Sequence, residues 1–233
     1  MKYIISVEGN IGSGKSTLLK YLKSNLTYIN GYKVIYLQEP VNSWNEITDL
    51  DGKTIIEKFY ADQHKYSFSF QMMAYITRLS QLKNAINSAP INSIIITERC
   101  LYTDRNIFAK MLYDSNTMDH IEYTIYTKWF DEFIDYTKLT GLIYIETTPE
   151  VCVERIERRA RSGEELIPLA YLTSCHNYHN NWIMKDNPID SLVLDGNKIS
   201  DEHYERIISY IGNIIPTYRN AYDDYDLNQH HCC

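Results

Sequence analysis

The feature that most constrains the fold is a glycine-rich segment near the N-terminus, Gly9-Asn10-Ile11-Gly12-Ser13-Gly14-Lys15-Ser16-Thr17. It fits the pattern G-x-x-x-x-G-K-[ST], and it lies between an apolar β-branched run and an amphipathic run. The glycines let successive backbone N–H groups point inward at a phosphate, and the following helix adds its positive N-terminal end. In this pattern Lys15 reaches the β- and γ-phosphates and the Ser16 hydroxyl binds Mg²⁺. The segment therefore predicts a site for a nucleoside triphosphate.

Short apolar segments alternate with longer helical patterns along the chain. We expect strands at 3–7, 33–38, 93–97, 142–146 and 191–194, and helices at 15–25, 54–87, 104–113, 119–139, 149–161, 167–185 and 201–214. Strands that are apolar on both faces and joined by crossover helices indicate a parallel sheet covered on both sides. The segment 54–87 has to bend or break, because helices beyond about 25 residues are unusual in globular domains. The prediction is an α/β fold with a five-stranded parallel sheet, one domain over 1–215 and a tail over 216–233.

Charge and composition exclude several classes of protein. The 233 residues carry 23 Lys and Arg against 30 Asp and Glu, a net charge of -7, which argues against binding DNA or RNA by general electrostatics. The apolar run at the N-terminus is too short for a signal peptide, and no segment reaches transmembrane length. The five Cys lack the spacing of a disulfide framework, which indicates free thiols. We expect a cytoplasmic protein with neither a nucleic-acid nor a membrane partner.

The phosphate loop alone leaves GTPases, motor ATPases and kinases of small molecules open. A GTPase adds D-x-x-G at the end of a strand and N-K-x-D for reading guanine. Here 49–52 match D-x-x-G, but no apolar strand precedes them, and Asn197-Lys198 is followed by Ile199-Ser200. The chain is also short for a motor. A kinase with a small acceptor is the interpretation that remains.

Three further clusters contain charged side chains. Two of them directly follow predicted strands, where open α/β sheets bind ligands, and the third lies at the end of a predicted helix. They are E-P-V-N-S-W at 39–44, E-R-C-L-Y-T-D-R at 98–105 and R-I-E-R-R-A-R-S-G-E-E at 155–165. With S-F-S-F-Q at 67–71, T-P-E at 148–150 and I-P-L-A-Y-L at 167–172, they resemble the deoxynucleoside kinase family over about 2–211. The resemblance implies a P-loop kinase fold with an arginine-rich lid at about 155–167.

The activity that the resemblance implies is phosphorylation of a deoxyribonucleoside at its 5′-hydroxyl, a step of nucleotide salvage, with ATP and Mg²⁺. It also implies a homodimer, because relatives pair equivalent helices and the stretches 70–86 and 123–133 carry more apolar surface than one sheet face needs. Two alternatives stay open. One is a P-loop nucleoside monophosphate kinase, and the other is a nucleotide-binding regulator without turnover.

The catalytic side chains implied by the resemblance are Lys15, Glu39, Glu98 and Arg99. Phosphoryl transfer needs the acceptor hydroxyl oriented, its proton accepted and the migrating charge neutralised. Glu39 matches the carboxylate beside the 5′-hydroxyl, and Arg99 matches the arginine that keeps it ionised and meets the transferred phosphoryl group. Glu98 is either a metal ligand together with Ser16 or the proton acceptor, so two candidates for the base remain.

For the donor, the resemblance adds lid arginines and a late loop to the phosphate loop. The expected ATP-binding residues are Gly9, Asn10, Ile11, Gly12, Ser13, Gly14, Lys15, Ser16, Thr17, Arg155, Arg159, Arg161, Asp195, Gly196 and Asn197. Lid arginines that clamp a triphosphate also exclude water. Arg158 is either part of this clamp or part of a solvated helix face.

For the acceptor, the resemblance implies a mostly apolar pocket with a few polar groups. Its expected residues are Glu39, Val41, Trp44, Ile56, Phe59, Tyr60, Phe70, Gln71, Ala74, Arg78, Arg99, Asp104, Phe108 and Glu164, with Ile11 at the border. The amide of Gln71 pairs with the base edge, Phe70 and Phe108 sandwich the base, and Tyr60 touches the 3′-hydroxyl. Glu164 matches the lid carboxylate for the 3′-hydroxyl, with Glu165 as the alternative because Gly163 stands where relatives carry a first Glu.

The preferred base is predicted from Arg78 and Asp104. Arg78 lies about two helical turns after Gln71, on the same helix face, with Ala74 between them. Members of the family that accept deoxycytidine and purine deoxynucleosides carry this Arg–Asp pair, whereas members that accept thymidine have uncharged residues there. We therefore expect deoxycytidine or a purine deoxynucleoside to be preferred over thymidine.

Overall fold

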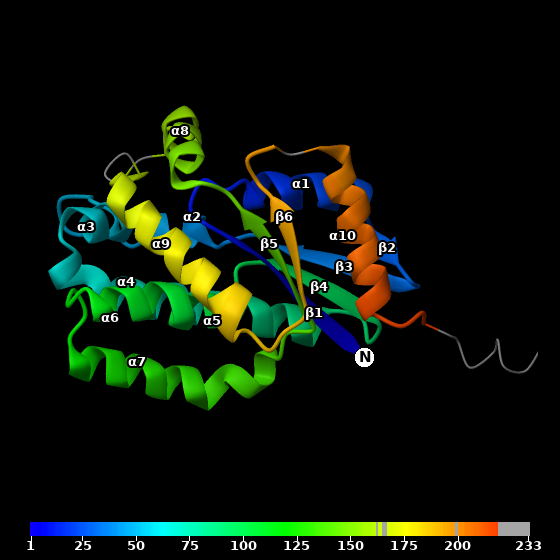
Figure 1. Cartoon of the computed structure of the whole chain (residues 1–233). Coiled ribbons are helices and arrows are strands. Elements are labelled where there is room, and N and C mark those ends of the chain that lie inside the picture. The colour runs from blue at the N-terminus through cyan, green and yellow to red at the C-terminus, as the bar shows by residue number, and fades with distance from the viewer. Residues whose placement is uncertain (162, 165–166, 199, 219–233) are drawn as a thin grey trace, which may run out of the picture.

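A six-stranded sheet organises the computed structural model, which describes residues 1–161, 163–164, 167–198 and 200–218 (Figure 1). The strand order is β2-β3-β4-β1-β5-β6. The strands are β1 (Lys2–Gly9), β2 (Tyr28–Ile29), β3 (Tyr32–Leu37), β4 (Ser93–Glu98), β5 (Gly141–Glu146) and β6 (Ser191–Asp195). All neighbouring pairs are parallel except β2 with β3. The five expected strands are therefore confirmed as one parallel sheet.

The sixth strand corrects the expected count. β2 is short and antiparallel, and it pairs Tyr28 with Lys33 and Ile29 with Tyr32. The turn between β2 and β3 is Asn30-Gly31, and both of its residues have positive φ, 49° and 85°. Asn-Gly is a strong hairpin signal because a tight hairpin needs positive φ at both turn positions. A strand of two residues is too short to show an alternating pattern.

Helices cover both faces of the sheet, as expected. The helical elements are α1 (Lys15–Asn25), α2 (Val41–Asn45), α3 (Ile55–Ala61), α4 (Gln63–Ser88), α5 (Leu101–Thr103), the π-helix η1 (Asp104–Ala109), α6 (Lys110–Asp114), α7 (His120–Phe133), the 3₁₀-helix η2 (Ile134–Thr137), α8 (Pro149–Arg159), α9 (Leu169–Asn181), the π-helix η4 (Trp182–Asp186) and α10 (Asp201–Ile214). On one face, α1 and α10 bury Leu19, Leu22, Ile207 and Ile211 against the strands. The larger core on the other face joins α4, α7 and α9.

The long helix expected at 54–87 breaks at Asp62, between α3 and α4. Asp62 has φ -150° and ψ 85°, and its carboxylate caps α4 by accepting a hydrogen bond from the backbone N–H of Lys65. A capping box between Thr54 and Glu57 fixes the start of α3. These two caps fix where α3 and α4 begin, and α3 forms part of the wall of the cavity described below.

Three further expectations for helices are corrected. The segment expected as a helix over 104–113 begins as the π-helix η1, and the helix expected over 119–139 ends at Phe133 before a 3₁₀ turn. The helix expected over 167–185 ends in the π-helix η4. The short helix α2 was not expected at all. Among the helices described, none combines the length and the apolar character that a membrane crossing requires.

Candidate active site

A cavity of about 950 Å³ lies at the C-terminal ends of β1, β3 and β4. Its walls come from the phosphate loop, the segment after β3, the end of β4, the interior side of α4 and the arginine-rich end of α8. The expected site residues that line it are Ile11, Gly12, Gly14, Lys15, Ser16, Thr17, Glu39, Val41, Trp44, Ile56, Tyr60, Phe70, Gln71, Ala74, Arg78, Glu98, Arg99, Asp104, Phe108, Arg155, Arg159, Arg161 and Glu164. Most of the residues chosen from the sequence therefore share one cavity.

Within the described part of the chain, seven of the expected site residues do not line the cavity. Gly9, Asn10 and Ser13 belong to the phosphate loop but are buried, and Phe59 is fully buried beneath Phe70. Asp195 is the last residue of β6, and Gly196 and Asn197 form the turn after it, where the Asn197 side chain accepts a hydrogen bond of 3.1 Å from the backbone N–H of Thr148. Glu165, the alternative to Glu164, lies outside the described residues, as do residues 219–233 of the expected tail.

Lys15 begins α1, and its side chain is folded back into the phosphate loop. Its Nζ donates hydrogen bonds of 3.1 Å to the carbonyl of Gly9 and 2.7 Å to the carbonyl of Asn10. Burial, followed by the nearby charge of Arg99, lowers the pKa of Lys15 to about 8. Gly12 in this loop has a φ of 80°, and an added Cβ atom would lie 2.6 Å from the carbonyl oxygen of Cys152. The close approach of α8 thus explains a glycine here.

Ser16 and Glu98 meet on the floor of the cavity. The Ser16 hydroxyl donates a hydrogen bond of 2.6 Å to Glu98 Oε1, and the backbone N–H of Glu39 donates one of 3.5 Å to Glu98 Oε2. A hydroxyl and a carboxylate are the hard oxygen ligands that Mg²⁺ takes beside phosphates. The chemistry of these two side chains fits a magnesium ion.

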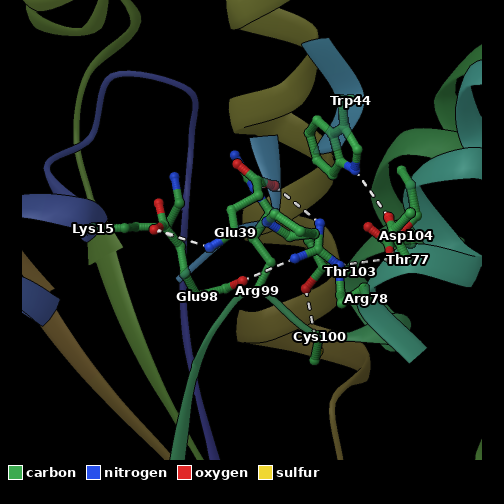
Figure 2. Close-up of polar contacts among 12 residues, drawn as sticks. Lys15, Glu39, Trp44, Thr77, Arg78, Glu98, Arg99, Cys100, Thr103 and Asp104 are labelled. Atoms are coloured by element: carbon green, nitrogen blue, oxygen red, sulfur yellow. Dashed lines mark hydrogen bonds and ion pairs between the residues drawn. The ribbon is translucent and has the colours of Figure 1, made fainter. Parts of the chain in front are cut away.

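Glu39 follows β3 and is paired with two arginines through the same oxygen (Figure 2). Its Oε1 lies 2.9 Å from Arg78 Nη2 and 3.4 Å from Arg99 Nε. Burial alone raises the pKa of a carboxylate, but Arg78, Arg99 and Lys15 outweigh it and lower the pKa of Glu39 to about 2. Glu39 is therefore an ionised carboxylate next to the phosphate loop.

Arg99 adopts a strained backbone conformation directly after β4. Its φ is 65°, in the left-handed region, which costs a residue other than glycine roughly 1–3 kcal/mol. The side chain is buried, its guanidinium stacks over the Phe108 ring at 4.8 Å, and Nη1 has no hydrogen-bond partner within the described residues. Strain together with a buried, unpaired donor is typical of a functional position rather than a structural one.

The expected pair between Arg78 and Asp104 is present. Arg78 Nε lies 2.9 Å from Asp104 Oδ2, and both side chains are almost fully buried. Burial raises the pKa of Asp104 to about 6, despite the opposing charge of Arg78. The π-helix η1 begins at Asp104 and also carries Phe108, so an irregular helix presents both side chains to the cavity. π-Helical turns often occur at functional sites.

Aromatic and aliphatic side chains form the end of the cavity away from the phosphate loop. Phe59 stacks on Phe70 at 4.4 Å with an interplanar angle of 11°, so it supports the Phe70 ring from behind. Trp44 meets Phe70 edge-on and donates a hydrogen bond of 2.9 Å from Nε1 to the Thr77 hydroxyl. Tyr171 also lines the cavity, although we did not expect it from the sequence. It lies in the I-P-L-A-Y-L motif, which was the available signal.

The arginine-rich end of α8 lies over the cavity. Glu164 is only 6% exposed and forms ion pairs with Arg159 and with Arg161, the latter at 2.9 Å. Arg155 donates a hydrogen bond of 3.1 Å to the carbonyl of Ser13 and so ties α8 to the phosphate loop. Arg158 lines the cavity as well but is an exposed residue, so both of its alternatives stay open.

Comparison with known proteins agrees with the fold and the cavity. The family model for deoxynucleoside kinases matches residues 5–216, and the chain belongs to this family. Its fold is accordingly that of a P-loop kinase, and the protein is a phosphotransferase.

Three relatives that resemble this chain are named for different deoxynucleosides. The chain is 36% identical to a probable deoxycytidine kinase of Fowlpox virus (strain NVSL), over 90% of this chain and 86% of the relative. It is 33% identical to deoxycytidine kinase of Homo sapiens, over 91% of each chain. It is 31% identical to mitochondrial thymidine kinase 2 of Homo sapiens, over 89% of this chain and 74% of the relative. Relatives named for different bases thus match at similar identity.

Proposed function

We propose that this protein transfers a phosphoryl group from ATP, with Mg²⁺, to the 5′-hydroxyl of a deoxyribonucleoside. The observation that carries the proposal is the carboxylate of Glu39, held by two arginines in the same cavity as the phosphate loop and Lys15. A carboxylate in this place accepts the proton of an acceptor hydroxyl, and the cations beside it meet the charge of the phosphoryl group. Of the two candidates for the base we favour Glu39, because Glu98 contacts Ser16 and the two together offer the oxygen ligands that suit Mg²⁺.

The chemistry follows from the positions of these side chains. Glu39 orients the 5′-hydroxyl and accepts its proton while the hydroxyl oxygen forms a bond to the γ-phosphorus of ATP. The bond between that phosphorus and the oxygen of the ADP leaving group breaks, and Lys15 and Arg99 stabilise the negative charge that moves. Ser16 and Glu98 would hold Mg²⁺, which would supply positive charge to neutralise the phosphates of the donor. The lid arginines Arg159 and Arg161 exclude water from the donor.

The preferred base in this proposal is cytosine or a purine rather than thymine. The ion pair of Arg78 with Asp104 fills the space next to Gln71 in which a 5-methyl group would lie, and its charged groups suit cytosine or purine edges. Gln71 is 2% exposed and presents both a donor and an acceptor to the base. Replacing Arg78 with Met and Asp104 with Ala is expected to raise turnover of thymidine relative to deoxycytidine.

A panel of the four deoxynucleosides with ATP tests the proposal. We expect ADP and a 5′-monophosphate from deoxycytidine or a purine deoxynucleoside, and no turnover by the Lys15→Ala variant. Faster turnover of deoxynucleoside monophosphates would instead identify a monophosphate kinase, for which the cavity would need further cations near the acceptor. ATP binding without any acceptor-dependent release of ADP would identify a regulator.

We also propose a homodimer formed through α4 and α7. Ile121, Ile125 and Trp129 lie at successive i, i+4 positions of α7 and are 70%, 40% and 43% exposed. On the neighbouring α4, Ile76 is 50% exposed. The two helices lie next to each other, and the Tyr75 hydroxyl on α4 donates a hydrogen bond of 3.0 Å to the carbonyl of Trp129. Such an apolar stripe on paired helices is typical of an interface between subunits.

A further inference from the structure

Both oxygens of the Glu164 carboxylate are held by arginines of the lid. Arg159 contacts Oε2, and Arg161 Nη1 lies 2.9 Å from Oε1. The Glu164 side chain is 8% exposed, whereas those of Arg159 and Arg161 are 33% and 34% exposed. All three residues line the same cavity as the phosphate loop. The carboxylate is therefore nearly buried, while the two cations that hold it stay accessible at the cavity wall.

A strained turn brings these three side chains together. Arg159 is the last residue of α8, and Ala160 after it has φ 50° and ψ 48°, in the left-handed region that residues other than glycine rarely adopt. A second turn follows at once, in which the backbone N–H of Glu164 donates a hydrogen bond of 3.1 Å to the carbonyl of Arg161. Backbone strain persists where the surrounding contacts maintain it, and the two ion pairs are contacts of this kind.

Glu164 lies at the end of the cavity proposed for the acceptor. Gly163, directly before it, packs on α3, where an added Cβ atom would lie 3.4 Å from Ile56 Cγ2. Ile56 and Tyr60 lie one turn apart on α3, and both line the cavity. Burial raises the pKa of Tyr60, and the nearby charge of Glu164 adds to this shift. A carboxylate next to these side chains is placed to accept a hydrogen bond from a hydroxyl of the sugar.

A guanidinium can hold a carboxylate and a phosphate at the same time. It is planar, stays charged and carries five N–H donors in a fixed fork. Arg159 and Arg161 belong to the proposed clamp on the donor, so their partners are a triphosphate on one side and Glu164 on the other. Fixing a long, accessible side chain costs conformational entropy, and a bound triphosphate already fixes these two. A second ligand that depends on the same ordered side chains then binds more tightly.

We propose that Arg159 and Arg161 are positioning residues that couple binding of the donor to recognition of the sugar 3′-hydroxyl, because they hold Glu164 and the donor's phosphates together. This inference rests on the proposed function and deepens it. It implies that ATP raises the affinity for an acceptor only where the acceptor carries a 3′-hydroxyl. Coupling between two binding sites is reciprocal, so such an acceptor raises the affinity for ATP by the same factor.

Titration calorimetry of the full-length protein measures this coupling. The acceptor probes are deoxycytidine and 2′,3′-dideoxycytidine, or the same pair with the base that the panel favours. The donor probe is β,γ-imido-ATP with Mg²⁺, which the protein cannot cleave. For the wild type we expect the donor probe to raise the affinity for deoxycytidine about fivefold or more, and the affinity for dideoxycytidine less than about twofold.

Three variants locate the coupling. In Glu164→Gln the effect of the donor probe on deoxycytidine should fall below about twofold, and in Arg161→Met, which keeps Arg159, to no more than about half of its wild-type value. Arg105→Met is the matched control and should keep the wild-type value. Arg105 also pairs with a carboxylate, that of Asp131, and its side chain is 35% exposed, but it is not among the described residues that line the cavity.

The outcomes separate this inference from the proposed function. Equal effects of the donor probe on deoxycytidine and dideoxycytidine in the wild type overturn the inference without any variant. Weaker binding of deoxycytidine to Arg161→Met by the same factor with and without the donor probe overturns it as well, because the arginine is then merely structural. Tighter binding to this variant without the donor probe also overturns it, because the arginine then competes with the sugar for Glu164. A wild type that phosphorylates no deoxynucleoside refutes the proposed function instead.

Discussion

The hydroxyl of Ser16 and the carboxylate of Glu98 are separated by 82 positions in the chain and joined by a hydrogen bond of 2.6 Å. The contact links the start of α1 to the end of β4, and it places two oxygen ligands of the kind that Mg²⁺ prefers next to the phosphate loop. Both residues were chosen from the sequence as metal ligands. Their proximity makes the role of Glu98 open to a direct test.

Replacing Glu98 with Gln keeps the shape of the side chain and removes its charge. We expect the magnesium concentration needed for half-maximal phosphorylation to rise by about 10- to 100-fold, because a neutral amide is a poorer ligand. A magnesium titration of the phosphorylation rate measures this. Glu205→Gln, on the exposed side of α10, is the matched control and should leave the titration unchanged. An unchanged magnesium requirement in Glu98→Gln would show that Glu98 has another role.

The lowered pKa of Lys15 predicts how ATP affinity depends on pH. In the free protein this pKa is about 8, and phosphates that bind next to the amine favour its charged form. Binding above pH 8 therefore requires uptake of a proton, so the affinity for ATP should fall about tenfold between pH 7 and pH 9. Titration calorimetry in buffers with different ionisation enthalpies measures both the affinity and the proton uptake. In Lys15→Arg the side chain stays charged, and the pH dependence should disappear. Equal affinities of the wild type at pH 7 and pH 9 would contradict the prediction.

Gly163 is expected to control how the lid packs on α3. It has a φ of 85°, and an added Cβ atom would lie 3.0 Å from Glu57 Cγ. Gly52 offers a matched comparison, because it has a φ of 81° and nothing within 4 Å of the added atom. Alanine at either position should cost about 1 kcal/mol of folding free energy through the positive φ.

Only Gly163→Ala should also raise the KM for the deoxynucleoside, because it displaces the neighbouring Glu164. A displacement that costs about 1 kcal/mol of binding corresponds to roughly a fivefold higher KM. Thermal unfolding and steady-state kinetics of the two variants measure the two effects separately. Equal KM values for Gly163→Ala and Gly52→Ala would show that packing of Gly163 on α3 does not affect the acceptor site.

The proposed interface predicts the effect of a charge on α7. In Ile125→Glu a carboxylate would be buried between two subunits, so the dimer should dissociate. Light scattering at micromolar concentration should give a mass near 27.4 kDa for this variant and twice that mass for the wild type. Ile208→Glu is a matched control, because Ile208 on α10 is 41% exposed and Ile125 is 40% exposed. A wild-type mass near 27.4 kDa would rule out the homodimer.

The parts of the fold predicted from the sequence are those with local causes. The phosphate loop has a fixed motif, and the five parallel strands are apolar on both faces because helices cover both sides. The break at Asp62 was located only to within a long segment, because no proline or glycine marks it and an aspartate cap is a weaker signal. The π-helix at Asp104 was missed because it depends on packing against α4 and α9 rather than on the residues within it.

For the site, the sequence identified residues better than it identified their partners. Arg78 was expected to pair with Asp104, and it does, but its contact with Glu39 was not expected. Arg99 was expected to be the arginine that keeps Glu39 ionised, whereas the structure places Arg78 closer. No spacing rule connects a residue after a strand to the middle of a helix 39 positions later. Such contacts depend on how α4 crosses the sheet.

The sheet order has a consequence for how the chain acquires its structure. β1 is synthesised before all the other strands, yet both of its neighbours, β4 and β5, come much later. Until residues 93–98 have been made, the strand that carries the phosphate loop has neither of its pairing partners, and it lacks the second one until residues 141–146 follow. Contacts between such distant segments slow folding and leave an apolar strand exposed in the meantime. A ribosome-bound chain that ends before β5 should therefore be a target for chaperones and fail to bind ATP.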